Sequence, residues 1–226
     1  YYSDKFNYSK LNNFGVAHAK GDFYVLMNND IEVLQENWME QMLSNCEREE
    51  VGVVGARLYY PDNTIQHAGL VIGIGGSLRG IGANLYQGMR RERSGYLHRA
   101  AFQMNYSAVT AALMMVKKEV YEKAGGFEEE LSVAFNDVDF CLRVRNIGYL
   151  IVYDPLVEAY HYESKSRGAE DSPEKVARFQ AEIEFMRNRW ENFLKKGDPN
   201  YNIHFSRVRA DYSLGDPEMI LRQNRK

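Results

Sequence analysis

The sequence predicts an α/β fold in which a sheet with parallel strands is flanked by helices. Two short, continuous apolar runs, FYVLM at 23–27 and VGVVGARLYY at 51–60, have the length and composition of strands buried on both faces. Between them, Trp38, Met42 and Leu43 recur at helical spacing. A strand, a helix and a second strand in this order are typical of a parallel crossover unit.

The chain length and the balance of charges limit the class of protein. The 226 residues are 45% hydrophobic, so we expect one domain over 1–226, with a C-terminal helix and surface arm at 170–226. The 28 basic residues nearly balance the 31 acidic ones, which argues against nucleic acid as a partner. No apolar run approaches the roughly 18 residues of a membrane-spanning helix. Cys46 and Cys141 form no CxxC pair, which favours a reducing, cytoplasmic location.

The remaining segments differ in how clearly they are patterned. Residues 61–107 contain a run rich in Gly and Arg without periodicity, and we expect a long, mobile loop there. The glycines are not followed by GK[ST] or a periodic helix, so the nucleotide-binding fingerprints fail. Apolar runs predict further strands at 107–116, 149–155 and 157–162. Helical spacing predicts helices at 117–127, 137–147 and 173–196.

The segment FNDVDFCLRVRNIGY, 135–149, places two acids at the start of a helix. Its apolar face carries four side chains, Phe140, Cys141, Val144 and Ile147. Asp137 falls on this apolar side. One interpretation is that Asn136 or Asp137 caps the helix and Asp139 pairs with Arg143. The other makes Asp137 a general base whose pKa is raised by partial desolvation in a cleft. The position in the sequence leaves both open.

Two further groups of polar residues follow predicted strands. Asn28, Asn29 and Asp30 end the first strand, at the edge where parallel sheets bind ligands. Their oxygen atoms suit Mg²⁺ or Mn²⁺, and the alternative is a turn rich in Asn and Asp, which is common. His161 ends a later strand and precedes a charged loop. It is either a packed imidazole or a ligand that completes the coordination of a metal.

Taken together, these segments resemble the family-two bacterial glycosyltransferases of the GT-A fold, which build O-antigen, rhamnan and other surface polysaccharides. The resemblance runs from Phe6 to Gly168 and rests on five phrases: FNYSKLNNFGVAHAKGDFYVLMNNDIEV, DNTIQHAGLVIG, NYSAVTAALMMVKKEVYEKAGGFEEEL, FNDVDFCLRVRNIGYLIVYDP and YHYESKSRG. It implies a Rossmann-like mixed sheet flanked by helices. It also implies an inverting transfer of a sugar from a nucleotide diphosphate sugar to a saccharide or lipid-linked saccharide.

The resemblance assigns expected roles to individual residues. Asp137 would be the general base, and Asp30 and His161 would hold Mg²⁺ or Mn²⁺. The residues expected to bind the donor are Asn13, Asn28, Asn29, Lys165 and Arg167. The residues expected on the acceptor side are Thr110, Asn136 and Asp139. The chain departs from the family at three positions, where Asn28 replaces an Asp, Asn136 a Glu and Asn12 an Arg.

Inverting chemistry is consistent with a single carboxylate base. The acceptor hydroxyl needs one base, and a cation can stabilise the departing diphosphate. The substitutions Asn28 and Asn136 favour a different hypothesis, a non-catalytic module that binds carbohydrate or nucleotide. A nucleotidyltransferase with a related sheet would need a Gly-rich basic loop after its first strand.

Members of this family begin with an apolar strand that has no counterpart before Phe6. We therefore expect a sheet that lacks its first strand–helix units and has an exposed edge, which a second copy of the chain could cover. In the full-length protein we expect peripheral attachment to the inner face of the membrane.

Overall fold

The computed structural model describes residues 2, 3, 5–75, 80–163 and 172–216. Lys165 and Arg167 lie outside the described residues. Among the described helices, none combines the length and the apolar character needed to cross a bilayer.

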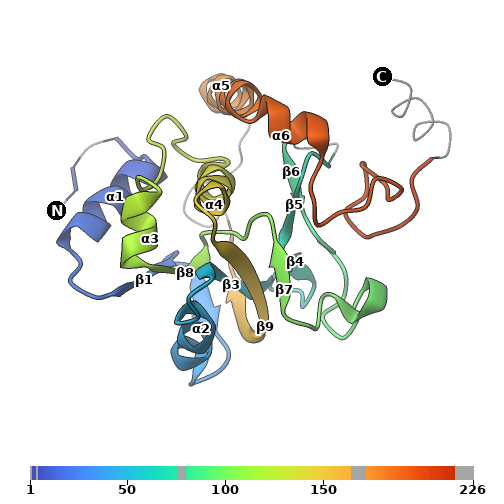
Figure 1. Ribbon diagram of the computed structural model, residues 1–226, viewed down its shortest axis with the longest axis horizontal. Helices are drawn as coiled ribbons and strands as arrows, with labels where there is room; N and C mark the ends of the chain where they lie inside the picture. The colour runs from blue at the N-terminus through green and yellow to red at the C-terminus, as the bar shows by residue number, and fades with distance from the viewer. Residues whose placement is uncertain (1, 4, 76–79, 164–171, 217–226) are drawn as a thin grey trace.

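A mixed sheet of seven strands forms the centre of the protein, as the sequence predicts (Figure 1). The main order is β1 (Phe23–Met27), β8 (Leu113–Lys117), β3 (Val51–Tyr59), β9 (Leu150–His161) and β2 (Ile31–Val33). Two short strands are added to it: β4 (Ile65–His67) pairs with β3, and β7 (Met104–Tyr106) pairs with β9. A separate hairpin contains β5 (Leu70–Ile72) and β6 (Gly82–Asn84).

The directions of the strands correct the simple crossover prediction. β1 and β3 run the same way, but β8 lies between them and is antiparallel to both. β3 and β9 form a parallel pair. All nine residues of β3 are buried, which explains why this strand reads as a continuous apolar run.

Helices cover both faces of the sheet (Figure 1). α2 (Trp38–Cys46) lies on the side opposite α1 (Tyr8–His18), α3 (Lys118–Lys123) and α4 (Asn136–Asn146). α2 buries Met42 and Cys46 against one face of the sheet. The predicted helix at 173–196 is instead two helices, α5 (Pro173–Arg189) and α6 (Glu191–Lys196), which meet at Trp190. The 3₁₀ turn η1 (Tyr96–His98) completes the described helical elements.

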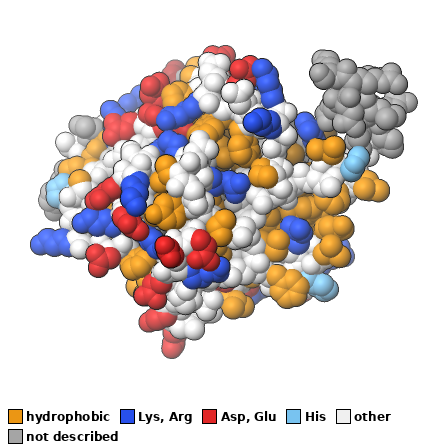
Figure 2. Space-filling model, in the orientation of Figure 1, with side chains coloured by type: hydrophobic (Ala, Val, Ile, Leu, Met, Phe, Trp, Pro, Cys, Tyr) orange, Lys and Arg blue, Asp and Glu red, His pale blue; other side chains and the backbone are white. Residues whose placement is uncertain are grey.

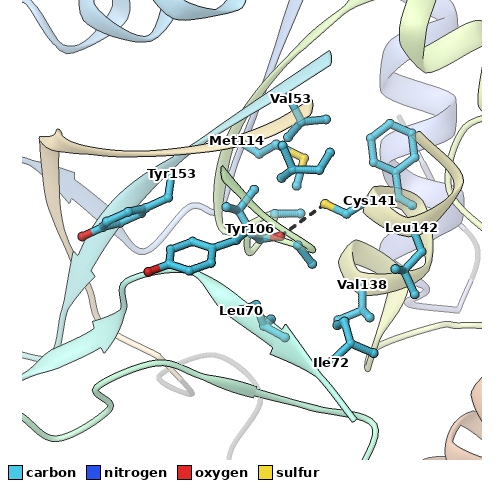
Figure 3. Close-up of a cluster of buried hydrophobic side chains, with 14 of the residues drawn as sticks. Val53, Leu70, Ile72, Tyr106, Met114, Val138, Cys141, Leu142 and Tyr153 are labelled. Carbon is cyan, nitrogen blue, oxygen red and sulfur yellow. Dashed lines mark hydrogen bonds between the residues drawn. The ribbon is translucent and has the colours of Figure 1, made fainter. Parts of the chain in front are cut away.

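The inner face of α4 packs onto the sheet (Figure 3). Val138, Cys141 and Leu142 lie in the same core as Val53 and Met114. The Cys141 thiol donates to the carbonyl of Val109, at 3.7 Å between Sγ and O. Burial raises the pKa of this thiol. Ile147, predicted on the same face, is 41% exposed because the helix ends at Asn146.

The prediction of a long, mobile loop at 61–107 is wrong for the described part of that segment. Besides β4 to β7 it contributes buried apolar side chains: Ile74, Ile81, Leu85, Tyr86 and Ala100. The segment also pairs with the C-terminal arm, since the backbone N–H of Tyr86 donates to the carbonyl of Ala210 at 2.9 Å. Strands of three residues separated by turns are too short to give a periodic pattern. Hydrophobic side chains gather on the surface on this side of the molecule (Figure 2).

Two strand predictions change in extent. The strand predicted at 107–116 begins only at Leu113, and residues 107–112 form an irregular segment beside α4. The strands predicted at 149–155 and 157–162 are one strand, β9. Ala56 pairs with Asp154 and Arg57 pairs with Glu158. The three residues between them in β9, 155–157, therefore have no partner in β3.

β1 forms one end of the sheet. Among the described residues, only β8 pairs with it. Met27, its last residue, is 50% exposed. β1 is therefore an edge strand of the described sheet.

Candidate functional site

A cleft of about 840 Å³ opens at the rim of the sheet where β1 and β9 end. It is lined by the turn between β1 and β2, residues 110–112, the start of α4 and part of α5. Seven of the residues singled out in the sequence line it: Asn28, Asn29, Asp30, Thr110, Asn136, Asp137 and His161.

Asp137 lies in the first turn of α4, half-buried at the cleft wall. Its Oδ1 accepts the N–H of Val138 at 2.8 Å, and its Oδ2 accepts the N–H of Ala111 at 3.3 Å. Desolvation raises the pKa of the carboxyl above its ordinary value, although these hydrogen bonds oppose the rise. The group therefore combines a raised basicity with access to the cleft.

The cap of α4 differs from the predicted one. The N-cap residue is Phe135, in the left-handed region with φ 63°, rather than Asn136 or Asp137. The ring of Phe135 stacks on Phe179 of α5 at 5.6 Å between centroids. A non-glycine residue in this region is strained and needs such support from its surroundings. Asn136 is nearly buried, and its Oδ1 accepts the N–H of Asp137 at 2.8 Å.

The loop before α4 is also held by Glu182 of α5. This buried carboxylate accepts the backbone N–H groups of Val133 at 2.9 Å and Ala134 at 3.2 Å. α5 therefore fixes the loop that leads into the first turn of α4.

Asp139 does not reach the cleft, which corrects its expected place on the acceptor side. Its side chain is fully buried and contacts Arg143 at 2.8 Å and the indole N–H of Trp190 at 2.9 Å. Arg189 lies 3.4 Å from it. The predicted pairing with Arg143 is confirmed. Two residues along a helix turn the side chain by about 200°, so Asp137 and Asp139 point to different sides.

His161 and Asp30 meet at the opposite wall of the cleft. His161 Nε2 lies 3.2 Å from Asp30 Oδ1 and 3.2 Å from Asn28 Nδ2. Ile31, which follows Asp30, pairs with His161 in the ladder between β2 and β9. The two side chains are therefore brought together by the sheet.

Asp30 and His161 supply two donor atoms that fit a divalent cation. Asp30 Oδ1 is buried and accepts no hydrogen bond from the described residues, although His161 Nε2 lies close to it. A carboxylate oxygen and an imidazole nitrogen suit Mn²⁺, and an oxygen-rich set suits Mg²⁺. The described residues contain no group of three or more His, Cys, Asp or Glu side chains that could hold a metal. The remaining ligands would have to be amide, water or substrate oxygens.

Asn13, expected to contact the donor, forms hydrogen bonds within the protein. Its Oδ1 accepts the N–H of Phe127 at 2.9 Å and the hydroxyl of Tyr121 at 2.6 Å, while its Nδ2 donates to the carbonyl of Phe127 at 2.9 Å. Its amide is thus engaged with the loop after α3. The neighbouring Asn12, by contrast, lines the cleft.

The sequence analysis missed two cations at the cleft, Lys175 and Arg178 of α5. Their spacing of three residues places them on one face of the helix, and this was the only signal available. It missed Gln66 and His67 as well. Burial lowers the pKa of His67 to about 4, so its imidazole is neutral.

Comparisons with known proteins identify the family of the chain. A family model described as Glycosyl transferase family 2 matches residues 3–125. The protein y4gI of Sinorhizobium fredii is 48% identical over 96% of this chain and 23% of its own length. The O-antigen biosynthesis protein RfbC of Myxococcus xanthus is 33% identical over 92% of this chain and 16% of its own length. The chain thus spans less than a quarter of these relatives.

A solved structure shares the fold. The crystal structure of GalNAc-T7 with UDP, GalNAc and Mn²⁺ covers 82% of this chain and 35% of its own chain, with a TM-score of 0.58 and 13% identity. At this identity the likeness concerns the fold alone.

Proposed function

The chain belongs to glycosyl transferase family 2 and has the expected GT-A fold, and from this premise we propose that it carries the reaction centre of an inverting glycosyltransferase. The sugar would pass from a nucleotide diphosphate sugar to a hydroxyl group of a saccharide or lipid-linked saccharide. The observation that carries the proposal is one cleft lined by a desolvated carboxylate, Asp137, and by the Asp30–His161 pair.

Asp137 is proposed as the general base. As the acceptor oxygen attacks the anomeric carbon, the bond from that carbon to the diphosphate breaks and the carboxylate takes the hydroxyl proton. The N–H groups of Val138 and Ala111 hold the carboxylate in place. A diphosphate is a good leaving group, so a second carboxylic acid is not needed.

Asp30 and His161 are proposed to hold Mg²⁺ or Mn²⁺. When bound, the cation would neutralise charge on the departing diphosphate. Asn28 and Asn29 lie beside this position and are proposed donor contacts. The site would bind a cation more weakly than a set of three carboxylates does, because the protein itself supplies few charged ligands.

Cationic side chains are proposed to add to this stabilisation. Lys175 and Arg178 line the cleft from α5. Lys165 and Arg167, outside the described residues, are proposed to reach the diphosphate as well. Arginine and lysine side chains form strong, charge-assisted hydrogen bonds with phosphate oxygens.

The acceptor is proposed to be a growing surface polysaccharide. The name of the RfbC relative, an O-antigen biosynthesis protein, supports this class of product. Thr110 and Asn136 lie on the Asp137 side of the cleft, where an acceptor hydroxyl would have to bind.

The experiment that tests the proposal compares wild type with Asp137→Asn in the full-length protein. A panel of nucleotide sugars is first screened by thermal shift with and without Mn²⁺, and transfer is then measured with the donor that binds. We expect Asp137→Asn to lower kcat by about 10²- to 10⁴-fold with donor affinity unchanged, because only proton transfer is lost. Asp22→Asn, an exposed acid at the opposite end of β1, is the matched control.

A second candidate function is a binding module without turnover. Asn28 and Asn136, which carry no charge at positions where the family has acids, favour it. Binding of Mn²⁺ and a nucleotide sugar without transfer by the full-length protein would support this function. An unchanged kcat in Asp137→Asn would instead remove Asp137 from the role of base.

A further inference from the structure

β4 is a short strand with a bulge at Gln66. Ile65 pairs with Tyr59 and His67 pairs with Leu58, so three residues of β4 face two residues of β3. Consecutive side chains of a regular strand point to opposite faces. A bulge changes the direction of the side chain at the extra residue, and bulges are frequent beside functional sites. Gln66 and His67 are both buried, at 5% and 1% exposure.

Gln66 binds the imidazole of His161. Its Nε2 donates to the carboxylate of Glu163 at 3.1 Å. Since a carboxylate only accepts, the Oε1 atom of Gln66 faces His161, where it lies 2.7 Å from Nδ1. Nδ1 therefore carries a proton and donates to Gln66, and in the neutral imidazole the lone pair is then on Nε2, beside Asp30.

His67 binds the segment that contacts Asp137. Its Nδ1 lies 2.6 Å from Oδ1 of Asn84 and its Nε2 lies 3.3 Å from the backbone nitrogen of Thr110. Nε2 is thus the acceptor for Thr110, and Nδ1 donates to Asn84. The next residue, Ala111, donates its N–H to Asp137.

The segment 110–112 touches both halves of the cleft. On one side Ala111 binds Asp137, and on the other the carbonyl of Ala112 accepts the N–H of Asn28 at 2.9 Å. A displacement of Thr110 would therefore change the position of the N–H that holds the Asp137 carboxylate.

We propose that Gln66 and His67 are paired positioning residues, one for each half of the cleft. Gln66 sets the tautomer and the orientation of His161, so that Nε2 is available to a cation. His67 holds the 110–112 segment in register with the Asp137 carboxylate. The inference rests on the proposed function and names two residues that touch neither substrate nor metal.

The role of Gln66 is tested by measuring the affinity of the full-length protein for Mn²⁺ alone. Electron paramagnetic resonance reports the binding. Gln66→Met removes the acceptor with little change in volume, and we expect it to weaken Mn²⁺ binding by about 10- to 100-fold. The double substitution of Gln66→Glu with Glu163→Gln keeps an acceptor for His161 and is expected to bind Mn²⁺ within about threefold of wild type.

The role of His67 is tested by two substitutions whose polar atoms reach different positions of the imidazole ring. His67→Gln can place an acceptor where Nε2 lies, whereas His67→Asn reaches only the position of Nδ1. We expect His67→Asn to lower kcat by about tenfold or more with the KM of the donor unchanged, and His67→Gln to recover most of this loss. Mn²⁺ affinity should be the same in both variants.

The outcomes separate this inference from the proposed function. A wild-type protein that binds no Mn²⁺ would overturn the metal site and the role of Gln66 with it. Wild-type binding that Gln66→Met leaves unchanged would overturn the role of Gln66 alone. Equal kcat values for His67→Asn and His67→Gln, with both variants folded by circular dichroism, would overturn the role of His67.

Discussion

His161 Nε2 lies 3.2 Å from Asp30 Oδ1, although the two residues come from distant parts of the chain. The contact follows from strand pairing, since β2 begins directly after Asp30 and pairs with the end of β9. The backbone adds a further bond, because the N–H of Tyr162 donates to the carbonyl of Asp30 at 3.0 Å. A pair held in this way has little freedom to separate, which suits a site that must keep its geometry without a cation.

The Asp30–His161 pair predicts a metal-dependent increase in stability. We expect Mn²⁺ to raise the Tm of wild type in proportion to its binding, and Asp30→Asn and His161→Gln each to abolish this increase. Differential scanning fluorimetry over a series of Mn²⁺ concentrations measures it. The Asp22→Asn control should respond as wild type does, and an equal response in all four proteins would contradict the assignment.

The raised pKa of Asp137 predicts a dependence of stability on pH. Because the folded-state pKa exceeds the unfolded one, the stabilisation from protonated Asp137 is complete below the ordinary carboxyl pKa and is lost as pH rises through the raised value. Asp137→Asn should therefore gain Tm relative to wild type as pH rises above the ordinary carboxyl pKa. A difference in Tm that does not change with pH would contradict the desolvation of this carboxyl.

The same pKa predicts the acid limb of the activity profile. A base must be unprotonated to accept the acceptor proton, so kcat should fall with a slope of one as pH drops through the raised pKa of Asp137. The measurement is kcat against pH at saturating donor. A flat profile down to the ordinary carboxyl range would mean that another group or another step limits the rate.

Asp139 is predicted to matter for stability and not for ligand binding. It is a buried charge that compensates Arg143, so Asp139→Ala should destabilise the fold by about 3–5 kcal/mol. Trp190→Phe removes one hydrogen bond to it and should cost about 1 kcal/mol. Urea denaturation gives both values. Weaker Mn²⁺ binding by folded Asp139→Ala would contradict the separation of Asp139 from the cleft.

The exposed edge at β1 predicts self-association of this 226-residue chain. An unpaired strand edge beside an exposed apolar side chain favours pairing with another copy. We expect light scattering at micromolar concentration to give a mass above that of a monomer, and Met27→Lys to lower it. A monomer with no dependence on concentration would refute the prediction.

Local patterns in the sequence were sufficient for the elements that have a strong periodicity. β3, α2 and α4 lie where the apolar runs and helical spacing predict them, because burial on one or both faces leaves a regular pattern. The 61–107 segment has no such pattern. Its strands have three residues each, which is too short for a periodic pattern, and β7 pairs with β9, which lies far away in the chain.

The sequence by itself determined the strand that ends just before Asn28–Asp30, the helix that starts beside Asp137 and the strand that ends at His161. Each depends on neighbours within a few residues. Only the tertiary structure decided which polar side chains face the cleft. It buried Asp139 against Trp190, engaged Asn13 with the loop after α3, and brought Gln66 and His67 behind the site. These outcomes depend on packing between segments distant in sequence, and local propensity carries no record of that packing.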